Sequence, residues 1–236
     1  MRYDEDLAAR LQRNEITPTI RIYGWKPWAI SLGYNQKESE INFRKCEEDG
    51  IDVVRRATGG RAILHAHEVT YSVVMYAEER SISEIYSDIS NALVAGLQAI
   101  HPEIEMEMSQ PHFPTLYRKA ESFPCFSSSA RYEIQINGRK LVGSAQRRFT
   151  SQEFPEVVLQ HGSILLGPQH KRLATYFNNT DSESLRKIES DFDQKTIDLE
   201  TAVGRSVSFE EVGEAILKGF EKEWGITMES YNEAVL

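Results

Sequence analysis

Cysteine is scarce in this sequence. The two cysteines, Cys46 and Cys125, are too few for a disulfide framework. No apolar run approaches the roughly 20 residues that a membrane-spanning helix needs, and the N-terminal stretch MRYDEDLAARLQRN is too charged for a secretory signal. The net charge of −9 argues against general binding of nucleic acid. We therefore expect a reduced, cytoplasmic protein with neither a membrane nor a nucleic acid as its partner.

Several common chemical motifs are missing as well. No pair of histidines or cysteines has the spacing of metal ligands, so no metal site is expected. The loop around Gly59-Gly60 lacks the Gly-Lys-Ser/Thr ending of a Walker loop and does not match a dinucleotide fingerprint. The run Ser127-Ser128-Ser129 has no GxSxG elbow around it. The sequence therefore gives no motif evidence for a nucleotide-binding protein or a serine hydrolase of the classes that these motifs define.

The pattern of apolar residues predicts an α+β domain. The chain of 236 residues fits one large domain, or one domain with a small appendage. Strands interleaved with single helices come first, and a helical tail follows. The predicted strands cover 19–23, 29–32, 51–54, 62–65, 69–75, 103–108, 132–136, 139–145 and 157–166. The predicted helices cover 3–13, 38–48, 82–100, 169–178 and a last one that Ser208 and Glu211 open.

A β-hairpin is the strongest local signal. Tyr132, Ile134 and Ile136 alternate with polar residues, as in a half-buried strand. Asn137-Gly138 then suits a type I′ turn, which needs two residues with positive φ. The return strand starts at Arg139 and carries Lys140 just after the turn. Lys140 is thereby fixed on a rigid element, although a lysine in such a place is most often a solvated surface charge.

Two further stretches are candidates for function. In RRATGGRAILH, Gly59-Gly60 would let a ligand approach the backbone, and Arg55 and Arg56 would suit a phosphate or a carrier protein. Read alone, this loop is better explained as a tight turn between strands. Cys125 follows Pro124 in a loop-like segment, where catalytic residues are common, whereas Cys46 reads as a small buried apolar residue.

Taken together, these segments are similar to the superfamily of lipoate–protein ligases, biotin ligases and octanoyltransferases. The resemblance runs from Tyr3 to about Leu166 and is carried by DVVRRATGGRAILH, the helix at 82–100, RYEIQINGRKLVGSAQRR and QHGSILL. It implies a mixed β-sheet flanked by helices, with a tunnel for a medium-chain acyl group. It also implies a catalytic domain over 1–178, with 179–236 as a helical extension packed on it.

The resemblance implies a set of site residues. Cys125 would be the nucleophile and Lys140 the active-site lysine. The substrate-binding residues would be Arg55, Arg56, Gly59, Gly60, Arg61, His65, Gly143, Ser144, His161 and Gly162. Read alone, His161 would be a structural histidine.

Within the superfamily, the details favour the cysteine-dependent octanoyltransferases of the LipM type. Ligases that use ATP usually carry Gly-Gly-Gly-Ala-Val-x-His-x-Asp where this chain has Gly59-Gly60-Arg61-Ala62-Ile63-Leu64-His65. The type implies that octanoyl acyl carrier protein acylates Cys125. A lysine of a lipoyl domain or of a glycine-cleavage H protein then takes the acyl group, with no cofactor. The insert TSQEFPE at 150–156 departs from the family's usual run and puts the choice of acceptor in doubt.

Two alternatives stay open. The chain could be an ATP-dependent lipoate or biotin ligase, in which Cys125 is incidental. It could also be a non-catalytic binder of acyl carrier protein or lipoyl domains, which has no use for a reactive thiol. Because such partners are commonly acidic, we expect a local basic rim for docking, with Arg147, Arg148, Lys171 and Arg172 as its candidates.

Overall fold

The computed structural model describes residues 1–107, 132–178 and 181–230. The strands are β1 Thr19–Tyr23, β2 Ala29–Leu32, β3 Asp52–Arg55, β4 Ile63–His65, β5 Glu68–Tyr76, β6 Ile104–Met106, β7 Ile134–Ile136, β8 Arg139–Phe149 and β9 Val157–Leu165. The helices are α1 Arg2–Gln12, α2 Phe43–Glu48, α3 Ile82–Leu97, α5 Ser182–Lys195, α6 Leu199–Val203 and α7 Phe209–Trp224, with 3-10 helices η1 Glu38–Glu40 and η3 Pro168–Tyr176. The predicted order of strands and helices is thus largely confirmed.

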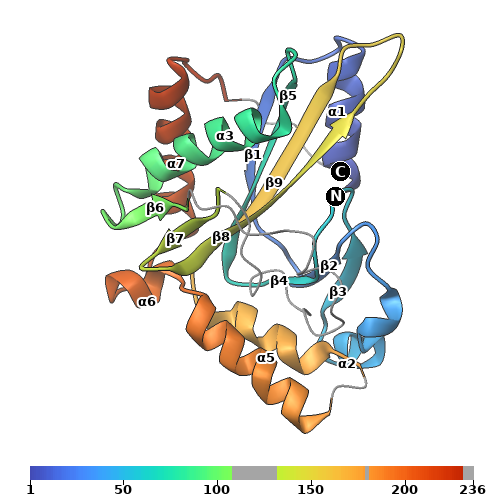
Figure 1. The fold of residues 1–236 in the computed structure, drawn as a ribbon, viewed down its shortest axis with the longest axis vertical. Coiled ribbons are helices and arrows are strands. Elements are labelled where there is room, and N and C mark those ends of the chain that lie inside the picture. The colour runs from blue at the N-terminus through green and yellow to red at the C-terminus, as the bar shows by residue number, and fades with distance from the viewer. Residues whose placement is uncertain (108–131, 179–180, 231–236) are drawn as a thin grey trace.

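A six-stranded sheet forms the centre of the molecule (Figure 1). Its order is β1-β5-β9-β8-β7-β6, and every neighbouring pair is antiparallel. A second sheet has the order β3-β2-β4, with β2 parallel to β3 and antiparallel to β4. The glycine loop connects β3 to β4 in this smaller sheet.

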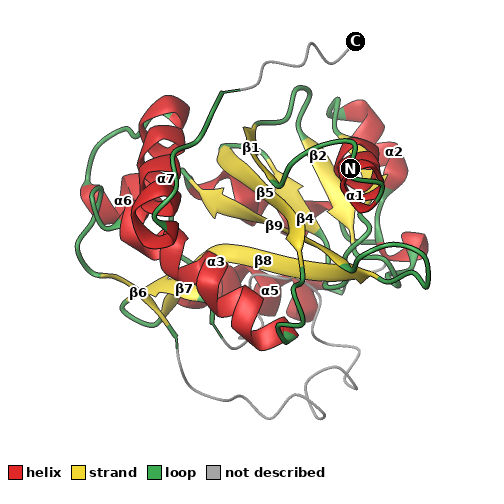
Figure 2. Ribbon diagram, turned by 90° about the horizontal axis from the view of Figure 1, so that it is seen from above, coloured by secondary structure: helices red, strands yellow, loops and turns green. Residues whose placement is uncertain are grey.

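The two faces of the large sheet are covered differently. Alternate residues of a strand point to opposite faces. Leu159 on β9 and Val74 on β5 pack against Leu7 and Leu11 of α1. On the opposite face, Ile22 of β1 lies under Gly213 of α7. Figure 2 shows α3 and α7 at one side of the molecule and α1 and α2 at the other.

Two glycines bring α3 and α7 into close contact. A Cβ atom on Gly96 would lie 2.3 Å from the Ala215 carbonyl oxygen, and a Cβ atom on Gly219 would lie 2.3 Å from the Ala92 carbonyl oxygen. Only glycine fits at such distances. The apolar face predicted for the last helix is buried in this contact, since Val212, Ile216 and Phe220 are all fully buried. The C-terminal helix therefore completes the main hydrophobic core.

Several predicted boundaries were wrong. The helix expected at 38–48 is split into η1 and α2, and that at 169–178 is the 3-10 helix η3. Helix α5 was not predicted, although Leu185, Ile188 and Phe192 mark its apolar side. The hairpin turn is confirmed, because Asn137 and Gly138 both have positive φ. The division of the chain at residue 178 stays a prediction. No helix of the described residues is long and apolar enough to cross a bilayer.

Candidate active site

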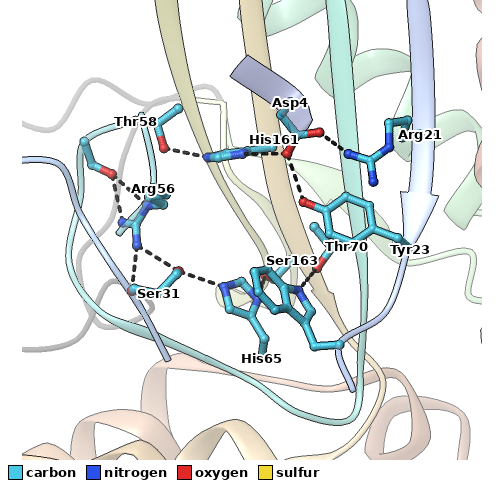
Figure 3. Close-up of polar contacts among 12 residues, drawn as sticks. Asp4, Arg21, Tyr23, Ser31, Arg56, Thr58, His65, Thr70, His161 and Ser163 are labelled. Carbon is cyan, nitrogen blue, oxygen red and sulfur yellow. Dashed lines mark hydrogen bonds and ion pairs between the residues drawn. The ribbon is translucent and has the colours of Figure 1, made fainter. Parts of the chain in front are cut away.

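A layer of buried polar side chains lies between the large sheet and the small one (Figure 3). His161 and Ser163 on β9 stand opposite Ser72 and Thr70 on β5, so all four point to the same face of the large sheet. All four are buried. The small sheet supplies Ser31 on β2, together with His65 on β4 and Arg56 just after β3. Hydrogen bonds across this layer, such as the one of 3.2 Å between Ser163 on β9 and His65 on β4, join the two sheets.

His65 lies at the centre of one group of hydrogen bonds. Its Nδ1 atom is 2.9 Å from Oε1 of Glu68, and its Nε2 atom is 2.7 Å from Oγ of Ser31. A carboxylate only accepts hydrogen bonds, so Nδ1 of His65 donates to Glu68. The indole of Trp25 stacks on the imidazole with ring centroids 4.4 Å apart and donates to Thr70 at 2.9 Å. These contacts on both ring nitrogens and on the ring face hold His65 in position.

Arg56 holds the glycine loop in shape. Its guanidinium donates to the carbonyl oxygens of Gly59 at 2.8 Å and Arg61 at 2.7 Å, and to the carbonyl of Ser31 at 2.9 Å. Gly60 has a φ of +94°, a conformation that side chains disfavour. A Cβ atom on Gly33 would lie 1.9 Å from the Gly60 carbonyl oxygen, so β2 and the loop meet only because position 33 is glycine.

His161 joins the glycine loop to the N-terminal helix. Its Nε2 atom lies 2.6 Å from the Thr58 hydroxyl, and its Nδ1 atom faces Oδ2 of Asp4 at 3.9 Å. Asp4 also accepts from Tyr23 at 3.1 Å and forms an ion pair with Arg21 (Figure 3). Burial lowers the pKa of His161, which is therefore neutral at pH 7. Burial raises the pKa of Asp4, but His161 and Arg21 outweigh this effect and hold the pKa below its usual value.

A narrow cavity opens into this polar layer. It encloses about 330 Å³ of space between atoms, part of it open to solvent. Six of the predicted substrate-binding residues line it: Arg56, His65, Gly143, Ser144, His161 and Gly162. Gly162 must be glycine, since a Cβ atom there would lie 2.5 Å from the Gly143 carbonyl oxygen and 2.7 Å from the Tyr71 ring. Segments more than 100 residues apart in the sequence thus meet around one space.

A β-bulge places the side chain of Lys140 on the face of the large sheet that borders the cavity. On β7, Ile134 pairs with Val142 and Gln135 pairs with Lys140, so β8 has one extra residue between these pairs. Without the bulge, Lys140 would share a face with Val142. With it, Lys140 shares a face with Gly143, which lines the cavity. The side chain is buried, and its Nζ atom donates to Oε1 of Glu133 at 2.5 Å.

The other predicted residues that the structure describes lie outside the cavity lining. Arg55 donates to the carbonyl oxygens of Gly33 at 2.9 Å and Gln36 at 2.7 Å. Arg61 lies 3.5 Å from Glu40. Both arginines thus bind other parts of the protein. Gly59 and Gly60 are exposed at the tip of the loop. Cys125 lies outside the described residues.

Comparison with known proteins identifies the family. The sequence pattern of the lipoyl protein ligase A/B catalytic domain matches residues 1–221. An octanoyltransferase LipM from Geobacillus kaustophilus is 35% identical over 98% of this chain and 84% of its own length. Another from Exiguobacterium sibiricum is 36% identical over 96% of this chain and 83% of its own length.

This chain belongs to the lipoyl protein ligase A/B catalytic domain family. The family resemblance inferred from the sequence is thereby confirmed. A solved structure of lipoate-protein ligase A bound with ATP superposes with a TM-score of 0.73 over 97% of this chain and 81% of that one, at 20% identity. At this identity the likeness concerns the fold alone, and it confirms the α+β, lipoate ligase-like fold with sheets flanked by helices.

Two acidic residues of the candidate site were not predicted from the sequence. Asp4 is fully buried, although it was read as part of a charged terminus. Its spacing to Leu7, Ala8 and Leu11 follows the buried face of α1, and that signal could have marked it as a buried carboxylate. Glu133 pairs with Lys140, but only the observed pairing of β7 with β8 brings the two side chains together.

Proposed function

We propose that this protein is an octanoyltransferase that moves an octanoyl group onto the lysine of a lipoyl domain. The acyl group comes from octanoyl acyl carrier protein and passes through a thioester on Cys125. A glycine-cleavage H protein is a further acceptor. The proposal is supported by relatives that are 35–36% identical over nearly the whole chain and bear the name octanoyltransferase.

Lys140 is the structural observation that carries this proposal. A buried ammonium is costly unless it is paired, and here the carboxylate of Glu133 at 2.5 Å compensates it. The side chain lies on the cavity face of the sheet. Cys125 precedes Glu133 by eight residues (133 − 125 = 8) and Lys140 by fifteen in the sequence. A buried, paired lysine on the same face of the sheet as Gly143, which lines the cavity, supports transfer of an acyl group at this place.

The chemistry needs a thiolate and a proton carrier. Free cysteine has a pKa near 8.5, and an adjacent ammonium favours the thiolate. The Cys125 thiolate attacks the carbonyl carbon of the octanoyl thioester, and the departing carrier thiol takes a proton from Lys140. The acceptor lysine, after losing its own proton to Lys140, attacks the new thioester. The attacking nitrogen loses its second proton to solvent as the amide forms and the Cys125 thiolate is released. Thioester energy is kept in the first step, so no nucleotide is required.

Cys46 provides a natural control for the thiol. It lies in α2, is 1% exposed, and burial raises its pKa to about 11. A thiol with such a pKa is almost entirely protonated at pH 7, and only the thiolate is a good nucleophile. We therefore expect no acyl group on Cys46.

Docking of an acidic partner is part of the proposal. Of the predicted basic rim, Arg147 and Arg172 form no ion pair among the described residues; Arg172 lies over the ring of Trp28, whereas Arg147 lies beside the glycine loop. Arg148 pairs with Glu156 at 2.6 Å, and Lys171 pairs with Asp193 at 2.6 Å. Arg147 instead donates to the Ala57 carbonyl at 3.1 Å and lies over the rings of Tyr34 and Phe149. Among the described residues, no carboxylate forms an ion pair with it. Its charge stays available to a partner beside the glycine loop.

Intact-protein mass spectrometry tests the function. Incubation with octanoyl acyl carrier protein should leave one octanoyl group on the enzyme, and hydroxylamine should remove it because it is a thioester. Cys125→Ala should abolish both this adduct and transfer to a lipoyl domain, whereas Cys46→Ala should keep both. A Cys125→Ala enzyme that still transfers at the wild-type rate would refute the covalent route. ATP–pyrophosphate exchange with octanoate or lipoate would then support the ligase alternative.

A further inference from the structure

The main chain of Lys140 has two different neighbours in the sheet. On one side, Gln135 of β7 pairs with it. On the other side, β9 pairs with β8 only from Val142 onward. At Lys140 a segment from the C-terminal part of the chain replaces β9. Thr196 forms a parallel bridge with Lys140, and the N–H of Ile197 donates to the Lys140 carbonyl oxygen at 3.0 Å.

The segment Thr196–Ile197 is itself held firmly. Thr196 follows the last turn of α5 and is 2% exposed. Its hydroxyl lies 2.6 Å from the carbonyl oxygen of Phe192 and 2.8 Å from Nε2 of His170 on η3. The side chain of Ile197 belongs to the main hydrophobic core. These contacts leave the segment little freedom to move.

The residues that follow this segment are bound to the chain just after β9. Asp198 is buried and caps α6 by accepting from the N–H of Thr201 at 2.9 Å. The N–H of Glu200 donates to the carbonyl of Leu166, directly after β9, at 3.0 Å. The segment thus fills the gap that opens between β8 and β9 at Lys140.

We propose that Thr196–Ile197 is a positioning element for Lys140, so that the C-terminal extension takes part in setting the active site. This inference rests on the proposed function, in which Lys140 moves protons. The ammonium position depends on the main chain of β8, which is irregular at this point because of the bulge. Ile197 holds the Lys140 carbonyl at the irregular position. Misplacement of a catalytic group by about 1 Å can reduce a rate roughly 10²-fold.

Two substitutions at one position separate this role from general stability. Ile197→Pro removes the N–H that binds Lys140. The extended conformation of Thr196 (φ −120°, ψ 154°) is the one that a following proline requires. Ile197→Val is the matched control, because valine is close to proline in size and keeps the N–H. Both variants lose part of the same buried side chain.

The readout is the reactivity of the Lys140 amine towards acetic anhydride, measured by mass spectrometry as a function of pH. The exposed Lys218, with 76% of its side chain accessible, is the internal reference. We expect Ile197→Pro to raise Lys140 acetylation relative to Lys218 and to lower kcat for octanoyl transfer roughly 10²-fold. The KM for the donor should change little. Ile197→Val should leave the acetylation ratio and kcat near the wild-type values.

A folded Ile197→Pro enzyme with unchanged Lys140 acetylation and unchanged kcat would overturn the inference. If that variant does not fold, Thr196→Val decides the matter, with Thr201→Val as the control in the same extension. Thr196→Val should raise Lys140 acetylation, and equal acetylation in both threonine variants would also overturn the inference. If the wild-type enzyme transfers no octanoyl group, the proposed function fails, but the acetylation comparison still tests the positioning of Lys140.

Discussion

Acid should destabilise the fold through His170, which lies in η3. His170 is 3% exposed and contacts the Gly167 carbonyl through Nδ1 at 3.2 Å and the Thr196 hydroxyl through Nε2 at 2.8 Å. The ring of Phe192 packs edge-on against the imidazole, with the two ring centroids 5.7 Å apart. Burial favours the neutral imidazole, because a protonated ring would lose most of its hydration at this position.

The size of the effect follows from the pKa. Burial lowers the pKa of His170 from 6.5 to about 4. Between these pH values the unfolded chain holds a proton on His170 that the folded chain does not. The free energy of unfolding therefore falls as the pH drops through this range. The difference of 2.5 pH units (6.5 − 4), at about 1.36 kcal/mol each, gives a loss of about 3 kcal/mol.

Urea unfolding at a series of pH values measures this loss. His170→Gln keeps a polar side chain at the site and removes the titration. Between pH 7 and pH 4, wild-type protein should lose about 3 kcal/mol more stability than His170→Gln. Asp4 and His161 titrate in both proteins, so their contributions cancel in the difference. Parallel stability curves for the two proteins would refute this reasoning.

Three further perturbations have clear expected outcomes. Gly96→Ala should lower the free energy of unfolding by about 3 kcal/mol, because the new methyl group would lie 2.3 Å from the Ala215 carbonyl oxygen; an unchanged urea midpoint would contradict this. Glu133→Gln should slow formation of the acyl-enzyme roughly 10²-fold in single-turnover experiments, because Lys140 loses its charged partner; wild-type rates would argue that the pair is only structural. Arg147→Glu should raise the KM for the carrier protein and weaken its salt dependence, and an unchanged KM at low salt would exclude this docking site.

The elements that the sequence predicted correctly are those with a strong local signal. The hairpin turn at Asn137-Gly138 and the helix α3 need only neighbouring residues, through positive φ and apolar spacing. The sequence also signalled α5, since Asp181 caps it and Leu185, Ile188 and Phe192 follow at helical spacing, but this pattern was overlooked.

The side of the sheet on which Lys140 lies could not be predicted from the sequence. Strict alternation puts Lys140 with Val142, and the bulge moves it to the opposite face. No residue type at this position announces the bulge. The contacts of Asp4 with His161 and of Ile197 with Lys140 likewise join segments that only the complete fold brings together. The expected role of Cys125 stays a prediction.

The strand order of the large sheet has a consequence for the synthesis of the chain. β5 and β9 are neighbours in the sheet, but 80 residues lie between the end of β5 and the start of β9 (156 − 76 = 80). At about 5–20 residues per second, a ribosome needs about 4–16 s to make that stretch. During this time the edge of β5 that β9 will cover has no strand beside it, and such an edge pairs readily with other extended chains. Correct folding of the nascent protein therefore depends on β9 pairing with this edge of β5 before another polypeptide does.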